Sequence, residues 1–124
     1  MKRLVIESWL LLLYFDCIMH LSDFKRLHRI VREQSVNPDS KTEEICEQLC
    51  HAVDWACVFY FRRVLCLQRS AVTAVLLRRH GWRAQMVLGI QMLPLLSHAW
   101  VEVEGRIVND KPYMSEIFQV LERC

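Results

Sequence analysis

The spacing of the apolar residues changes at Gly81, and this change limits the fold classes that are open to the chain. Before Gly81 the apolar side chains recur every three to four residues, which is the period of a helix that buries one face. After Gly81 the pattern is typical of strands. Helices that come first and strands that follow predict an α+β fold, in which N-terminal helices pack on a small antiparallel sheet.

Four helices are predicted before Gly81. A capping box, Ser40 followed three residues later by Glu43, marks the start of the third, because the two side chains satisfy free backbone N–H groups there. Gly81 marks the end of the fourth, since glycine readily adopts the conformation that closes a helix. Asn37-Pro38 discourages a helix between the second and the third. The predicted helices are residues 3–19, 22–33, 41–61 and 66–80.

Three strands are predicted after Gly81. One covers residues 83–91, and the other two form a hairpin over residues 98–110. The hairpin turns near Glu104-Gly105, a dipeptide that suits a tight turn. Residues 115–121 are expected to form a short amphipathic tail.

The register of this hairpin depends on its loop. A two-residue loop would place His98 and Asp110 on opposite faces of the strands. A three-residue loop, with Gly105 in the left-handed conformation, pairs them directly. We predict the second register, because it creates an apolar pair and an oppositely charged pair. Its cross-strand pairs are His98 with Asp110, Trp100 with Val108, and Glu102 with Arg106.

Length and composition predict one domain with a buried core. The chain has 124 residues, of which 53% are apolar, and only 3 Gly and 3 Pro, unlike a disordered segment. We divide it into N-terminal helices (1–33), a connection (34–41) and a core (42–124). The net charge of +2 is too even to favour nucleic acid as the main partner.

Six cysteines in so short a chain raise the question of disulfide bonds. A secreted disulfide scaffold is rich in loops, whereas Cys46, Cys50 and Cys57 fall inside one helical pattern. We therefore expect the cysteines to be reduced and the protein to be cytoplasmic.

The N-terminal segment imitates a secretory signal peptide, but Glu7 interrupts the apolar stretch and no small-residue cleavage site follows. Its uninterrupted apolar run, Trp9–Phe15, is seven residues long, and a membrane-spanning helix needs roughly 20. We expect no membrane span and expect this helix to pack against the protein's own core. Docking on a membrane surface or on a partner protein is the alternative.

Cys66 is the candidate nucleophile, because it opens the fourth predicted helix. The free N–H groups and the dipole at a helix start favour the thiolate, which is the nucleophilic form. Arg62, Arg63 and Arg69 would act in the same direction. The alternative is a merely structural cysteine. The other five cysteines are expected to be inert.

His98 and Asp110 are the candidate partners of Cys66. A nucleophilic thiol needs an imidazole to accept its proton, and the imidazole needs a carboxylate or amide to orient it. The alternative is an ordinary surface histidine and an aspartate that ends a strand.

We expect no metal and no cofactor. A zinc site that uses Cys46, Cys50 or His51, and Cys57 is the alternative that we considered. Zinc modules usually take their ligands from turns with paired cysteines, which this helical segment does not resemble.

The motifs around the three candidate residues closely resemble those of lasso-peptide leader peptidases, which belong to the transglutaminase-like cysteine protease superfamily. The resemblance implies a transglutaminase-like or papain-like core over residues 42–124 and a triad of Cys66 as nucleophile, His98 as base and Asp110 as orienter. The matching motifs are C-L-x-R-S at 66–70, R-R-x-G at 78–81, and H-A-W-V-E-V-x-G-R-x-x-N-D at 98–110.

The resemblance implies a cysteine peptidase that removes the leader peptide from a ribosomally made lasso-peptide precursor. The implied partners are the precursor's leader, a separate leader-recognition protein, and a lasso cyclase that joins the exposed amine to an acidic side chain. Two alternatives stay open. One is amide transfer in the manner of a transglutaminase, and the other is a non-catalytic adaptor that binds a peptide by its sheet edge or first helix.

Overall fold

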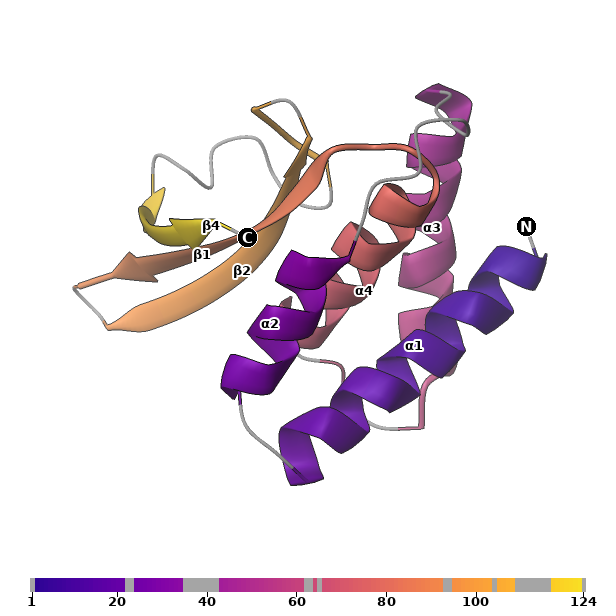
Figure 1. The fold of residues 1–124 in the computed structure, drawn as a ribbon, viewed down its shortest axis with the longest axis horizontal. Helices are drawn as coiled ribbons and strands as arrows, with labels where there is room; N and C mark the ends of the chain where they lie inside the picture. The colour runs from indigo at the N-terminus through magenta and orange to yellow at the C-terminus, as the bar shows by residue number, and fades with distance from the viewer. Residues whose placement is uncertain are drawn as a thin grey trace.

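The computed structural model describes residues 2–21, 24–34, 43–61, 64, 66–92, 95–103, 105–108 and 117–123. Within these ranges the helices come first and the strands follow, and Figure 1 shows the helices gathered beside the sheet. The fold is α+β, as predicted. The helices are α1 (Lys2–Leu21), α2 (Phe24–Glu33), α3 (Glu43–Phe59) and α4 (Cys66–Arg79), and the strands are β1 (Ala84–Gln91), β2 (Leu96–Val103), β3 (Arg106–Ile107) and β4 (Gln119–Arg123).

The described helices confirm the sequence pattern, since each begins and ends within two residues of its predicted limit. The sheet has the order β3-β2-β1-β4 with antiparallel neighbours. β4 was not predicted: the tail was expected over residues 115–121, and Gln119–Arg123 instead pairs with β1. An edge strand of five residues takes its stability from a distant neighbour, which local periodicity does not reveal.

The predicted hairpin register is wrong in the described residues. Val103 pairs with Arg106 and Glu102 pairs with Ile107, so the turn has two residues. The N–H of Val108 donates to the carbonyl of Val101 at 3.0 Å, which continues the same register. In this register Val108 shares the face of Val101 and Val103 and packs against the core. Val108 is thus partly buried against the core instead of pairing with Trp100, and the charged partner of Glu102 is Arg123 of β4 in place of Arg106.

Gly105 has a φ of +80°, which confirms the left-handed conformation predicted for it. A two-residue hairpin turn whose second residue has a positive φ favours glycine at that position.

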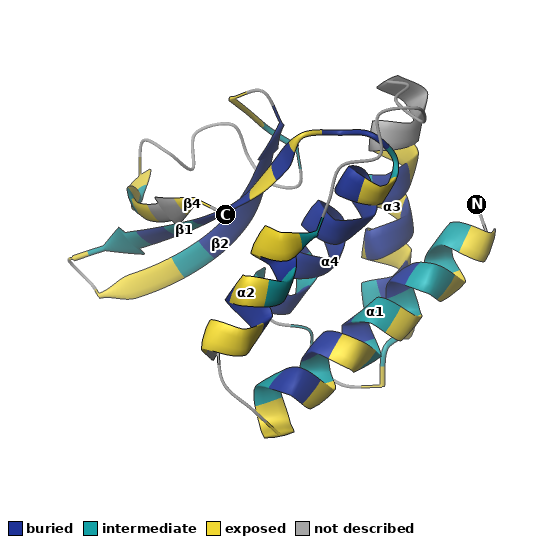
Figure 2. Cartoon of the chain, in the orientation of Figure 1, coloured by how far each residue is buried: buried dark blue, intermediate teal, exposed yellow. Residues whose placement is uncertain are grey.

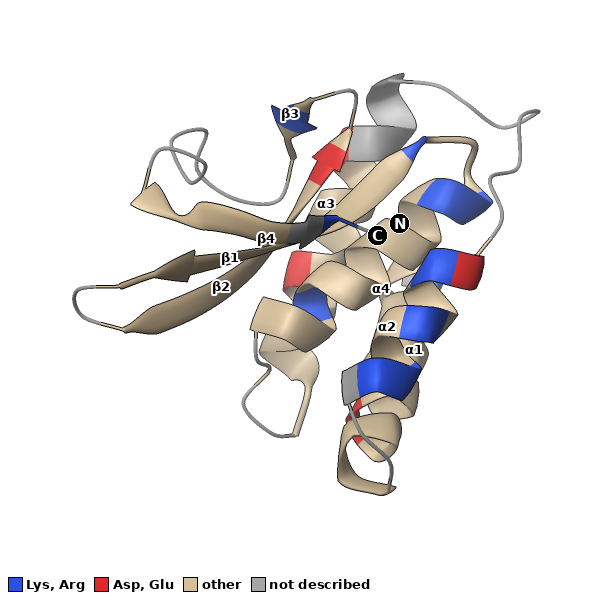
Figure 3. Cartoon of the chain, turned by 60° about the vertical axis from the view of Figure 1, so that its left-hand side comes forward, with Lys and Arg blue, Asp and Glu red and all other residues tan. Residues whose placement is uncertain are grey.

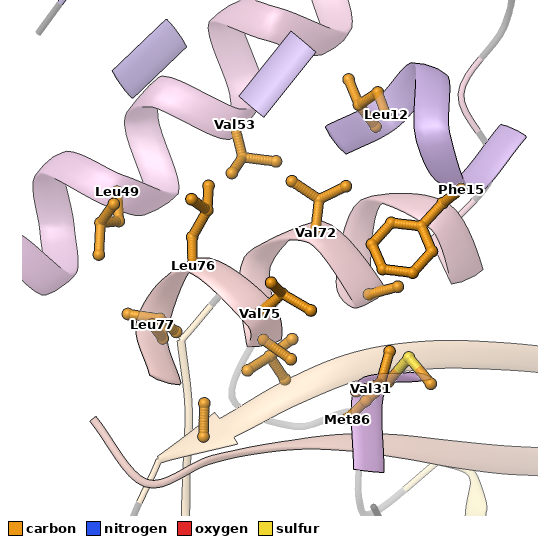
Figure 4. Close-up of a cluster of buried hydrophobic side chains, with 14 of the residues drawn as sticks. Leu12, Phe15, Val31, Leu49, Val53, Val72, Val75, Leu76, Leu77 and Met86 are labelled. Carbon is orange, nitrogen blue, oxygen red and sulfur yellow. The ribbon is translucent and has the colours of Figure 1, made fainter. Parts of the chain in front are cut away.

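The hydrophobic core surrounds α4, which lies between the other helices and the sheet. This helix is buried without interruption from Ser70 to Arg78, because it has neighbours on all sides. Figure 4 shows Val72, Leu76 and Val75 of α4 among side chains from α1, α3 and the sheet. The face of the sheet toward α4 carries Ala84, Met86, Val101 and Val103.

One side of α1 belongs to this core, which confirms the predicted packing. Leu12 and Phe15 are buried, whereas Ile6 and Leu10 on another side of the helix are exposed. Figure 2 shows buried and exposed residues alternating along α1. Over Arg3–Leu21, α1 is long and apolar enough to cross a membrane by length and composition, a criterion that core helices of soluble proteins and signal sequences also meet.

Positive charge gathers on α2, beside α1. Its exposed face carries basic residues along its length, and they stand out in Figure 3. The buried side of α2 holds Leu27 and Val31 against the core. The exposed basic residues of α2 are Lys25, Arg26, Arg29 and Arg32.

Candidate active site

Cys66 is the first residue of α4, as the sequence predicts, and its thiol is free. It is half-buried, so the sulfur combines a helix N-terminus with partial access to solvent. The helix behind it is anchored throughout its length in the core. A side chain at the start of a well-packed helix is held in a fixed place, as a reactive group requires.

His98 lies in β2, where it pairs with Gly89 of β1. Cys66 and His98 line the same pocket, a cavity of about 340 Å³ with a mainly apolar wall. Two of the three predicted site residues thus line one pocket, although they lie far apart in the sequence. The lining residues are Cys66, Leu67, Leu88, Gly89, Ser97, His98, Ala99 and Leu121.

The imidazole of His98 makes contacts with aromatic rings. It stacks on Phe118 with ring centroids 5.5 Å apart, and it lies 6.2 Å from the ring of Trp100. Alternation along β2 places His98 and Trp100 on the face of the sheet opposite to Val101, which packs toward α4. The histidine thus borders the pocket as a member of an aromatic cluster.

Asp110 lies outside the described residues. The two-residue turn does not give the direct pairing of His98 with Asp110 that the sequence predicted, because continued regular pairing would set Asp110 opposite Ala99. The role of Asp110 as orienter of the imidazole therefore stays a prediction. The hairpin register that was expected to pair it with His98 differs from the observed register.

Three arginines were expected to act on Cys66, and the described residues include Arg69 among them. Arg62 and Arg63 lie outside the described residues. Arg69 pairs with Asp54 of α3, with Nη2 2.9 Å from Oδ1. Its charge also acts on Cys57: burial raises the pKa of the Cys57 thiol, Arg69 opposes this, and Asp54 adds to it. Cys57 consequently favours the neutral thiol, in agreement with the inert role predicted for it.

Trp100 lies beside His98, and Trp100 and Glu102 were named from the sequence only as members of cross-strand pairs, without a role at the site. Trp100 Nε1 donates to Glu102 Oε2 at 3.0 Å, and Arg123 Nε lies 3.6 Å from Glu102 Oε1. The alternation of His98, Trp100 and Glu102 in the H-A-W-V-E motif was the available signal, because alternate residues of a strand share a face.

A second cavity, of about 510 Å³, lies where α3, α4 and β3 meet. Its wall is part polar and part apolar, and it includes Glu47, His51 and Arg106. Among the residues that the structure describes, no group of three His, Cys, Asp or Glu residues is placed to hold a metal ion. The side chain of Cys46, part of the zinc alternative, lies outside them.

A cysteine at a helix start and a histidine on a strand that lines the same pocket are residue types that a thiol-based acyl-transfer site uses. The comparisons with known proteins give the family. The model of the transglutaminase-like superfamily matches residues 9–123, so the chain belongs to that superfamily.

A curated protein is similar to part of the chain. The microcin J25-processing protein McjB of Escherichia coli is 36% identical over 56 residues, which are 45% of this chain and 27% of that protein. The matched part thus spans about a quarter of the relative's length. No solved structure gives a match.

Proposed function

We propose that this protein is a cysteine peptidase that removes the leader peptide from a lasso-peptide precursor. The observation that carries the proposal is the pocket shared by Cys66 and His98. Similarity to a microcin-processing protein and the motifs around these two residues support the choice of substrate.

In the proposed reaction the Cys66 thiolate attacks the carbonyl carbon of the scissile peptide bond, and a tetrahedral intermediate forms. Protonated His98 gives its proton to the leaving amine, which departs as the C–N bond breaks. Water, deprotonated by His98, then attacks the thioester and releases the leader acid and the free thiol. Asp110 is proposed to orient the imidazole.

We further propose that the enzyme acts in the cytoplasm with a separate leader-recognition protein and a lasso cyclase. The released amine is the product that such a cyclase needs as its substrate. The pocket itself is small and apolar, which supports a division of labour: the pocket receives the residues around the scissile bond, and the partner holds the rest of the leader.

The test is an in vitro reaction of the purified protein with the precursor peptide and the recognition protein, followed by mass spectrometry. The expected products are the intact leader and the core peptide with a new α-amine. Cys66→Ala and His98→Ala should each abolish them, whereas Cys50→Ala, a matched change in α3, should not. Cleavage by Cys66→Ala at the original rate would rule out this nucleophile, and a product that joins the acyl group to an added amine would indicate transglutaminase-type transfer.

A further inference from the structure

The indole of Trp100 is held at both of its ends. Its Nε1 donates to Glu102 Oε2 at 3.0 Å. At the other end, the six-membered ring lies so close to Gly89 of β1 that a Cβ there would be 2.7 Å from Cη2. Trp100 is fully buried. The ring therefore has one orientation available in the folded protein.

Glu102, which orients the indole, is itself a buried carboxylate that is held from a distant strand. Its side chain is 8% exposed, and a charge at such a position requires partners. Trp100 donates a hydrogen bond to one carboxylate oxygen, and Nε of Arg123 in β4 lies 3.6 Å from the other oxygen. β1 lies between β2 and β4 in the sheet, so this ion pair reaches across the central strand.

His98 is the member of this cluster that borders the pocket. Its imidazole lies beside two aromatic neighbours, Trp100 and Phe118, and the three rings form a triangle. The rings of these two neighbours are 6.2 Å apart, and the Cβ of Phe118 also closes on Gly89. A shift of the indole would consequently move the surface against which the imidazole packs.

We propose that Glu102 is a positioning residue for the imidazole of His98, acting through Trp100, and that Arg123 fixes the carboxylate. Glu102 is not a catalytic residue in this assignment, because it acts on the imidazole only through the indole. The inference rests on the proposed function, in which His98 is the base. It explains why a buried acid stands two residues after the tryptophan in the H-A-W-V-E motif: its oxygen accepts the indole N–H.

The experiment compares Trp100→Phe, Glu102→Leu and Glu102→Gln in the full chain. Phenylalanine removes the N–H donor and leucine removes the acceptor, whereas glutamine keeps an oxygen that accepts the N–H. The first readout is the imidazole resonances of His98 by NMR without substrate, assigned with His98→Ala. We expect them to shift or broaden in Trp100→Phe and Glu102→Leu, and to stay close to the original positions in Glu102→Gln.

The second readout is the steady-state kinetics of precursor cleavage. We expect kcat to fall by roughly tenfold to a hundredfold in Trp100→Phe and Glu102→Leu, because misplacing a reacting group has an effect of this size. KM should change less than about twofold, and Glu102→Gln should recover most of kcat.

The matched control is Val103→Ala, on the same strand but on the face that packs toward α4. It should lower Tm and leave both the His98 resonances and kcat of the folded protein unchanged. If Trp100→Phe and Glu102→Leu lower Tm like this control and change neither readout, the role is structural and the proposal is overturned. Failure of the proposed function is recognised separately: His98→Ala would still cleave the precursor, while the NMR comparison would continue to decide the positioning role.

Discussion

The guanidinium of Arg78, in the last turn of α4, donates a hydrogen bond from Nε to the backbone carbonyl of Ala84 in β1 at 2.8 Å. From Nη1 it also donates to the carbonyl of Val31, near the C-terminus of α2. The last carbonyls of a helix have no partner within the helix, so a buried cation beside them satisfies free acceptors. Arg78 thereby joins α2, α4 and β1, and it does so while it is 8% exposed.

Arg78→Met should lower the free energy of unfolding by about 2–4 kcal/mol, because buried carbonyls lose their donor. Urea denaturation measures this loss. Arg79→Met is the matched control: Arg79 is exposed and its contact is an ion pair with Glu7 at 3.3 Å, which contributes at most about 1 kcal/mol. Equal losses in the two variants would contradict the bridging role of Arg78.

Gly105→Ala should lower the free energy of unfolding by about 1–2 kcal/mol, since a φ of +80° is unfavourable for a residue with a Cβ. Apart from Gly105 and its two chain neighbours, no atom of the described residues lies within 4 Å of the place that this Cβ would take, so the loss comes from the backbone. Gly105→Asn should lose less, because asparagine tolerates the left-handed conformation. Thermal unfolding of the two variants side by side checks the order, and an alanine variant as stable as the original would be inconsistent with it.

Gly89→Ala should be harmful for a different reason. The added Cβ would lie 2.7 Å from Trp100 and 2.8 Å from Phe118, both of which contact His98. Overpacking of this kind costs about 1–3 kcal/mol of unfolding free energy, which a urea titration can measure. The variant should also shift the imidazole resonances of His98, whereas Gly105→Ala should not. Unchanged resonances in Gly89→Ala would argue against the close packing.

Sequence reasoning succeeded where the determining interactions are local. Gly81 marked the end of α4 and Gly105 the position of the turn, because each acts within a few residues. Ser40 of the predicted capping box lies outside the described residues. The hairpin register was decided elsewhere, by burial of Val108 in a core built from helices distant in the sequence. The apolar pair of Trp100 with Val108 and the charged pair of Glu102 with Arg106 had favoured the opposite choice.

In the candidate site, too, local sequence accounts for some features and distant strands account for others. Cys66 was predicted from its place at a helix start and His98 from its motif, and the pocket contains both. The pair of Glu102 with Arg123 depends on β4, whose pairing with β1 is not encoded in a local period. A partner supplied by a distant edge strand becomes visible only in the folded chain.

Phe15→Ala should lower the free energy of unfolding by about 3–5 kcal/mol, because it leaves a cavity in the core beside Val72 (Figure 4). Leu10→Ala, on the exposed side of the same helix, should change the free energy of unfolding by no more than about 0.5 kcal/mol.

Deletion of residues 1–20 should cause aggregation, because it uncovers the apolar surface of α4. Urea denaturation measures the two substitutions, and light scattering detects aggregation of the deletion variant. A soluble, folded deletion variant would show that α1 is dispensable.

Labelling with iodoacetamide should distinguish Cys66 from Cys57. Burial raises the pKa of the Cys57 thiol, so below that raised value Cys57 holds a smaller fraction of thiolate than an ordinary cysteine and reacts slowly. Cys66, at the start of α4, should be modified first near neutral pH. The difference should narrow as the pH rises through the raised pKa of Cys57, since its thiolate then accumulates. Mass mapping after short reaction times measures both rates, with Cys66→Ala to confirm the fast site; Cys57 labelled ahead of Cys66 at pH 7 would remove the basis for Cys66 as nucleophile.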